Sequence, residues 1–185
     1  MSDTREAAAG AADTASLVAV LSTTSFGAHL PPDGQVRLAR LARRYQAPAG
    51  TVLLAEGEPA NELGVIVGGR VALRTPVPDH GMTTILTLEP GDVFGVSALV
   101  PPYRMTHSCV AVQPVDVIAL SGPRLRAALA SDCETAAILY TRLLQAMTRR
   151  LGATRLQLLD LYASRPDGLS QLPSRAGSAP AESRP

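Results

Sequence analysis

Between Ala47 and Leu120 the sequence alternates short runs rich in Val, Leu and Ile with breakers rich in Gly, Pro and Asp. The runs have the length of β-strands, and the breakers recur too often to leave room for crossover helices. Strands this short and this regularly spaced are typical of an all-β sandwich or barrel and not of a parallel sheet. Gly68 and Gly69 lie between two alternating runs, and they predict a tight hairpin turn.

Helices are expected on both sides of this β region. Pro31–Asp33 starts one, because proline is tolerated in a first helical turn. Its apolar side carries Leu38 and Leu41, and its basic side continues to Arg43 and Arg44. We interpret the basic side as a solvated helix face, with a binding patch as the alternative.

Residues 133–162 predict one long helix, with Asp132 as its cap. A heptad pattern fits this segment, and about 30 residues at 1.5 Å each give a rod of roughly 45 Å. A domain of this size cannot cover such a rod with its own β core, which favours a homodimer. The alternative is a helix that folds back on its own domain. The predicted dimer seam contains Leu144, Met147, Leu151, Leu158 and Leu161.

Composition limits the remaining organisation. The chain has 185 residues and is 46% hydrophobic, which predicts one ordered domain over residues 14–163. Residues 1–13 and 164–185 are polar and rich in small residues, and we expect both to be disordered. All 17 basic residues are arginine, which excludes lysine Schiff bases and a P-loop. The net charge of +1 provides no overall field that would attract nucleic acid or an acidic membrane.

The two cysteines, Cys109 and Cys133, are interpreted as free thiols in a reducing compartment. The N-terminus lacks the charged-then-apolar pattern of a signal peptide. No apolar run approaches the ~20 residues that span a bilayer. The sequence therefore predicts a cytoplasmic protein without a membrane partner.

Three segments together resemble one known family. Residues 56–63 followed by 65–71 resemble its first hairpin, and residues 88–95 (LEPGDVFG) resemble its L-x-P-G-D-x-F-G segment. The family is the cyclic-nucleotide-binding domain, the β-roll sensor of catabolite-activator and Fnr-type regulators, and the likeness covers about residues 28–163. The resemblance implies a mainly β fold, a double-stranded jelly roll with flanking helices, followed by a long C-terminal helix.

The resemblance also locates a ligand cassette after the β-strand that ends in Phe94. In the family, a glutamate directly after the cassette glycine accepts from the ribose hydroxyl, and an arginine near the cassette's end contacts the phosphate. Val96 and Thr106 occupy these two positions here. Each lost hydrogen bond to a charged group costs roughly 1.5–3 kcal/mol, so we expect no high-affinity cAMP or cGMP binding. The cassette positions are Phe94, Gly95, Val96, Ser97, Ala98, Arg104, Thr106, His107 and Ser108.

Arg104 leaves one alternative open. A shifted loop would let it reach an anion, together with hydroxyls such as that of Ser97; otherwise it stacks on Tyr103 or pairs with an acid. His107 and Cys109 are two residues apart on a predicted strand, so both face one side. Some relatives bind haem through such residues, but core packing is the favoured interpretation. We predict no metal site, because no metal-ligand spacing is present elsewhere.

The favoured hypothesis is a non-catalytic regulatory module that acts through dimerisation and a protein partner, without a cofactor. No nucleophile motif is present, so we expect no enzyme. One alternative is a true sensor of a cyclic nucleotide or another small anion. Another is a Crp/Fnr-like transcription regulator that lacks its own DNA-binding domain. Residues 164–185 are too few and too rich in Pro and Ser for a helix-turn-helix, so direct nucleic-acid binding is not expected.

Overall fold

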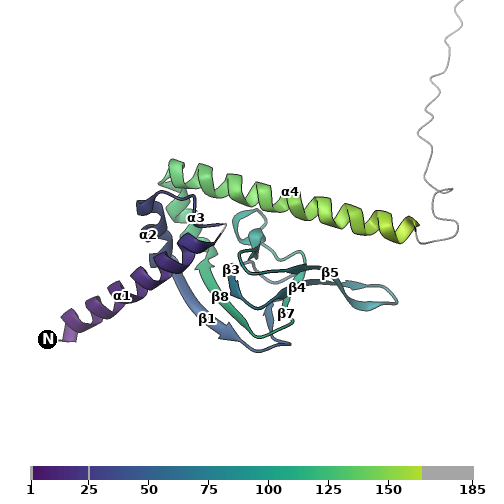
Figure 1. The fold of residues 1–185 in the computed structure, drawn as a ribbon, viewed down its shortest axis with the longest axis horizontal. Coiled ribbons are helices and arrows are strands. Elements are labelled where there is room, and N and C mark those ends of the chain that lie inside the picture. The colour runs from purple at the N-terminus through teal and green to yellow at the C-terminus, as the bar shows by residue number, and fades with distance from the viewer. Residues whose placement is uncertain (1, 25, 164–185) are drawn as a thin grey trace, which may run out of the picture. The chain divides into compact units, whose positions relative to one another are not determined.

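Two antiparallel four-stranded sheets form the centre of the molecule, which confirms the predicted β-roll (Figure 1). The computed structural model describes residues 2–24 and 26–163, and side chains within residues 13–24, 26–156 and at 159. One sheet has the order β1-β8-β3-β6 and the other β2-β7-β4-β5. The strands are β1 (Ala42–Ala47), β2 (Val52–Leu54), β3 (Glu62–Gly68), β4 (Val71–Val77), β5 (Gly81–Leu88), β6 (Val93–Phe94), β7 (Ser108–Ala111) and β8 (Val115–Ser121).

The central strands β3 and β8 are buried on both faces, because each has a hydrophobic layer on either side. On β8, Val117 belongs to the cluster inside the roll, and its neighbour Ile118 belongs to the cluster under the helices. On β3, Ile66 and Val65 divide in the same way. This explains why these strands have nearly continuous apolar runs and not a simple polar–apolar alternation.

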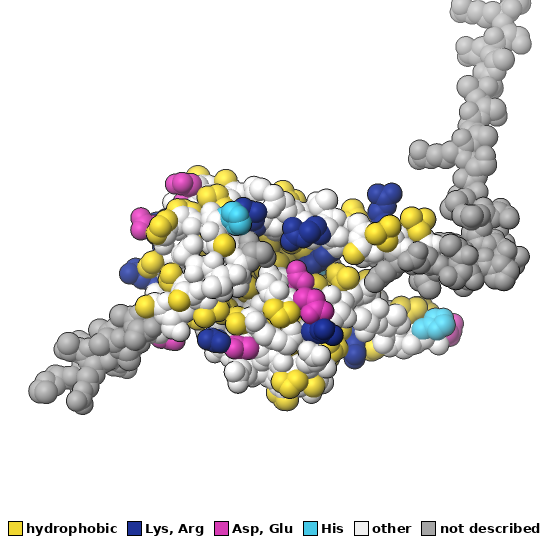
Figure 2. Space-filling view, in the orientation of Figure 1, with side chains coloured by type: hydrophobic (Ala, Val, Ile, Leu, Met, Phe, Trp, Pro, Cys, Tyr) yellow, Lys and Arg dark blue, Asp and Glu magenta, His cyan; other side chains and the backbone are white. Residues whose placement is uncertain are grey.

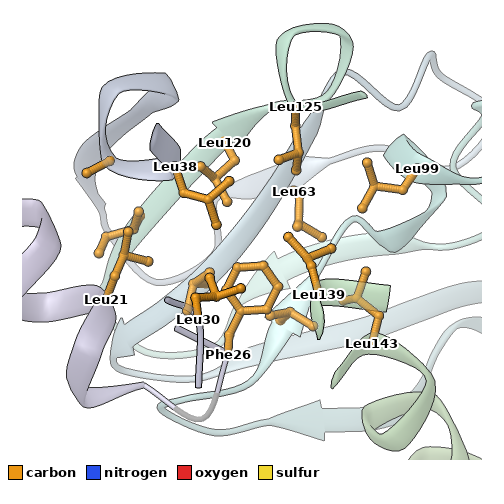
Figure 3. Close-up of a cluster of buried hydrophobic side chains, with 14 of the residues drawn as sticks. Leu21, Phe26, Leu30, Leu38, Leu63, Leu99, Leu120, Leu125, Leu139 and Leu143 are labelled. Carbon is orange, nitrogen blue, oxygen red and sulfur yellow. The ribbon is translucent and has the colours of Figure 1, made fainter. Parts of the chain in front are cut away.

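Helices cover the outer face of the first sheet. They are α1 (Ser2–Thr23), α2 (Pro32–Leu41), α3 (Gly122–Ala130) and α4 (Cys133–Ala163). Each helix contributes a buried leucine to one hydrophobic cluster on this face (Figure 3). These leucines are Leu21, Leu38, Leu125 and Leu139. α1 begins inside the segment 1–13 for which the sequence predicts disorder. The predicted disordered tail, residues 164–185, lies outside the described residues.

The second helix is shorter than predicted. Residues 42–47 form β1 and do not continue the helix, so Arg43 and Arg44 lie on a strand. The reason is the backbone pairing of β1 with β8, from Ala42 opposite Leu120 to Ala47 opposite Val115. Ion pairs add to this pairing, since Arg44 donates to both oxygens of Asp116 on β8 at 2.9 and 2.6 Å. Arg43 Nη2 lies 2.5 Å from Glu62 Oε2 on β3. These basic residues therefore make exposed ion pairs across the sheet, which add little to its stability and which the helical pattern did not indicate.

The Gly68–Gly69 turn is not a hairpin within one sheet. It joins β3 of the first sheet to β4 of the second. Gly69 has φ +79°, and a Cβ there would lie 2.1 Å from the carbonyl oxygen of Pro114. The glycine is needed for this close approach where the chain changes sheets.

The long C-terminal helix is confirmed, with bounds Cys133–Ala163. Asp132 caps it, because its Oδ1 accepts from the Thr135 N–H at 3.1 Å, and Arg37 lies 2.6 Å from its Oδ2. Within the first compact unit, residues 1–150, the buried side of α4 contains Leu139, Leu143 and Ala146. Among the described residues, no helix combines the length and the apolar character that crossing a bilayer requires.

Candidate functional site

The cassette begins where β6 ends. Gly95 has φ +73°, and a Cβ at this position would lie 2.3 Å from the Glu62 carbonyl oxygen. Only glycine fits such a backbone without strain. The chain then turns through a short 3-10 helix, Val96–Leu99, and reaches β7 by a loop that contains Tyr103, itself at φ +58°.

Apolar side chains from this segment fill the interior of the roll. Phe94 and Ala98 are fully buried, and Met105 is 3% exposed. The Phe94 ring lies against Gly64, where an added Cβ would come within 2.2 Å of the ring. Val96 packs on the cluster under the helices. The position that carries a glutamate in the resembled family thus makes an apolar contact here.

The guanidinium of Arg104 is hydrogen-bonded to the backbone of a neighbouring loop. Its side chain is exposed, and Nη1 donates to the Gly57 carbonyl at 2.8 Å. The main chain of the next residue, Met105, is bonded to the same loop. The Gly57 N–H donates to the Met105 carbonyl at 2.8 Å, and the Met105 N–H to the Glu58 carbonyl at 2.9 Å. Within the part of the chain that the structure describes, Arg104 therefore neither stacks on Tyr103 nor pairs with an acid, the two contacts that the sequence favoured for it.

Arg126 of α3 makes the contact that was expected of Arg104. Its guanidinium carbon lies 4.1 Å from the centre of the Tyr103 ring, and Nη1 donates to the Ala98 carbonyl at 2.5 Å. One arginine thereby ties the 3-10 helix and the following loop to α3. Sequence reasoning missed this residue, because nothing near Arg126 in the chain indicates a contact 28 residues away.

The polar residues at the end of the cassette bond to their neighbours. Thr106 is exposed, and its Oγ1 lies 3.0 Å from His107 Nδ1. Ser108 is buried, and its Oγ accepts from the Glu56 N–H at 3.0 Å. Ser97 is half-buried, and no hydrogen bond of its side chain to another described residue is recorded. Two of these three hydroxyls therefore already contact a neighbouring group.

Cys109 lies fully buried in the roll, and Cys133 is exposed; both are free thiols. Burial raises the pKa of Cys109 to about 12, although the Gly95 N–H and the charge of Arg150 act in the opposite direction. Burial, followed by the charge of Arg150, lowers the pKa of the half-buried His107. Within the described part of the chain, no group of three or more His, Cys, Asp and Glu side chains could hold a metal ion.

Arg150 is a cation beside the cassette that the sequence did not single out. It comes from α4, and its Nη2 donates to the carbonyl of Val93, directly before Phe94. Its Nε is buried without a hydrogen-bond partner. Burial lowers the pKa of Arg150, and the charge of Asp92 opposes that shift. The pair of adjacent arginines at 149–150 was the available signal.

The predicted dimer seam is partly exposed where the structure describes it. Leu144 is 68% exposed and Met147 is half-buried, and Tyr140, one helical turn before Leu144, is 41% exposed. In the second unit, which begins at Leu151, that leucine is 63% exposed. The side chains of Leu158 and Leu161 lie outside the described residues.

Comparison with known proteins agrees with this geometry. Residues 44–132 match the family model of the cyclic nucleotide-binding domain. A "CRP-like cAMP-activated global transcriptional regulator" of Mycobacterium tuberculosis is 26% identical over 164 residues, which cover 86% of this chain and 71% of the relative. A solved structure of a putative cyclic nucleotide-binding protein from Geobacter metallireducens has a TM-score of 0.65 and 29% identity. It covers 71% of this chain and 95% of that one.

One relative is an enzyme. The acetyltransferase Pat of Mycolicibacterium smegmatis is 34% identical over 95 residues, which cover 51% of this chain but only 28% of the acetyltransferase. The similarity therefore extends over a minor part of that protein.

Proposed function

Since the chain belongs, through residues 44–132, to the cyclic nucleotide-binding domain family, we propose that it is a non-catalytic regulatory module without high-affinity cAMP or cGMP binding. It acts through dimerisation by α4 and through a protein partner. We place this module in the cytoplasm, because a reducing compartment keeps the thiols of Cys109 and Cys133 free.

The observation that carries the proposal is that residues at the cassette positions contact other parts of the same chain. Val96 packs on the core, and the Arg104 guanidinium donates to the Gly57 carbonyl at 2.8 Å. A nucleotide would need a carboxylate at the first position and a free cation near Thr106. Two missing charge-assisted hydrogen bonds weaken binding by about two to four decades.

Dimerisation is supported by the exposed apolar residues of α4. Leu144 and Leu151 are seven residues apart and are 68% and 63% exposed. Leucines at heptad spacing that the described residues leave exposed are typical of a helix that packs on another helix. A second copy supplies the same surface, so a symmetric pair is the simplest cover.

A second candidate function, a sensor of a cyclic nucleotide or another small anion, has one observation in its favour. Arg150 places a cation beside Val93, with a buried Nε that has no partner. A bound anion would satisfy this donor. In that case Arg150 replaces the absent arginine at position 106, and Arg104 keeps its bond to Gly57.

Isothermal titration with cAMP and with cGMP, each to millimolar concentration, tests the proposal. We expect no saturable heat from the wild type, and a dissociation constant below about 10 μM would refute the proposed loss of affinity. Val96→Glu with Thr106→Arg restores both polar groups, so this double variant should gain affinity.

Arg150→Gln distinguishes the two candidates if the wild type does bind. Loss of binding in this variant, with binding kept in Arg104→Gln, supports the sensor function. Arg104→Gln is the matched control, because it removes an arginine of the same cassette whose guanidinium already has a protein acceptor.

A further inference from the structure

A cavity on the helical side of the molecule lies outside the cassette. It has a volume of about 80 Å³ and lies between α4, the segment that joins α1 to α2, and the turn that joins β5 to β6. Its apolar lining includes Phe26 and Leu143, which Figure 3 shows close together. One water needs about 10–15 Å³ of such space, so the cavity has room for a group of several heavy atoms.

The polar lining of this cavity is rich in hydrogen-bond donors. Arg142, Arg149 and His29 provide cationic or N–H groups, and Gln145 adds an amide. Figure 2 shows a histidine and basic side chains close together on one face of the molecule. Asp92 is the one acidic side chain in the lining. Its Oδ2 already accepts from the Glu89 N–H at 3.0 Å.

The two arginines have few partners of their own. Arg142 Nη1 donates to Gln145 Oε1 at 3.1 Å, and no ion pair is recorded for Arg142 or Arg149 among the described residues. Burial is the main cause that lowers the pKa of Arg150, and the positive charge of Arg149 beside it acts in the same direction. Positive charge therefore exceeds negative charge around the cavity, which attracts an anion.

The spacing of the donors indicates the kind of anion. Arg142 and Arg149 are two helical turns apart, about 10.5 Å along α4, and His29 comes from another segment. Donors that approach from several directions suit a phosphate, which presents three or four oxygens, better than a planar carboxylate with two.

We propose that this cavity binds a phosphate group, either as inorganic phosphate or at the end of a phosphomonoester. A second hollow shares His29, Arg142 and Gln145 with the cavity and continues to Ala137 and Ile138. The carbon part of an ester would lie on this apolar extension. The site is independent of the cassette, so it stands whether or not the proposed function holds.

Binding here would connect α4 to the β5–β6 turn. Gly91, Asp92 and Val93 form one wall of the cavity, and Val93 also accepts the hydrogen bond of Arg150. A phosphate held between this wall and Arg142 and Arg149 would fix α4 against the strand that leads into the cassette.

Thermal melting of the full chain, at constant ionic strength set with sodium chloride, tests the proposal. The probes are inorganic phosphate and phenyl phosphate. We expect a saturable rise in Tm for the wild type, and at least a tenfold higher half-saturating concentration for Arg142→Gln with Arg149→Gln. Arg124→Gln is the control, because Arg124 is an exposed arginine on α3 outside the lining. It should respond like the wild type.

Tighter binding of phenyl phosphate would support the proposal and assign the site to phosphomonoesters, and tighter binding of inorganic phosphate would support it and assign the free ion. The absence of a saturable shift with either probe would overturn the proposal. An equal response of the wild type and the double arginine variant would also overturn it, because the anion would then bind elsewhere.

Discussion

The cassette after β6 and the outward side of α4 differ in what the chain itself supplies to them. In the cassette, Arg104 donates to the Gly57 carbonyl and Arg126 to the Ala98 carbonyl, and Phe94 is fully buried. On α4, Leu144 keeps 68% of its surface exposed. Side chains of the first region already contact other groups of the chain, whereas Leu144 of the second is left exposed by the described residues. Under the function proposed above, an α4 partner and not a nucleotide would complete this domain.

Substitutions of two leucines test the difference between the buried and the exposed side of α4. Leu139→Ala removes a fully buried side chain and should cost about 2–5 kcal/mol of unfolding free energy at every protein concentration. Leu144→Ala removes an exposed one, so its effect should be smaller and should depend on protein concentration, as expected for an interface between copies. Denaturant unfolding at two protein concentrations tests both. Equal, concentration-independent losses would contradict the account.

The packing beside the cassette can be tested with two glycines of β3. A Cβ at Gly64 would lie 2.2 Å from the Phe94 ring, so Gly64→Ala should lose about 3 kcal/mol, at the upper end of overpacking effects. At Gly68 the nearest atom to a new Cβ is Asp116 Cβ at 3.8 Å, so Gly68→Ala serves as the control with a small effect. If Gly64→Ala is as stable as the control, the interior of the roll has room for the added methyl group, and the close packing of Phe94 on Gly64 is wrong.

Removing the contacts between α3 and the cassette should lower the free energy of unfolding by a moderate amount. Arg126→Ala removes the hydrogen bond to Ala98 and the stacking on Tyr103, for about 1 kcal/mol, since the site is only half-buried. Hydrogen exchange of residues 96–103 should become faster. Arg124→Ala on the same helix is the control, and equal exchange in both variants would show that Arg126 does not hold the loop.

The last prediction concerns the reactivity of the two thiols, and it involves no change in stability. The pKa of Cys109 is raised to about 12 by burial, so in the native state its thiolate is scarce at any pH below that value. Cys133 is exposed and should react with a thiol reagent at once. Mass spectrometry should find one modified thiol per chain near neutral pH and two after unfolding. Rapid native modification of Cys109 would show that the roll opens.

The order of elements could be predicted from sequence because local patterns determine it. Turn residues and apolar runs located most strands, and the long helix was predicted at 133–162 and found at Cys133–Ala163. The placement of Arg43 and Arg44 on a helix was wrong, because they continue a helical pattern although they lie on β1. That strand forms by backbone pairing with β8, which is distant in sequence. The hairpin predicted at Gly68–Gly69 was wrong because the sequence does not show that the chain changes sheets there.

The cassette was located from its motif, but its contacts were not. Val96 and Thr106 could be assigned by position along the chain. The contacts of Arg104, Arg126 and Arg150 go to backbone carbonyls at Gly57, Ala98 and Val93. A carbonyl is present at every residue, so no side-chain pattern indicates which one an arginine will reach.

The mass of the protein in solution tests the central claim most directly. Sedimentation velocity of the wild type at micromolar concentration should give a dimer. Leu144→Glu with Leu151→Glu should give a folded monomer, because carboxylates buried without partners cost several kcal/mol. Gln145→Glu is the control and should stay dimeric, since Gln145 is an exposed residue outside the seam. A wild type that is monomeric throughout this range, with a double variant that is folded and unchanged, would contradict the account.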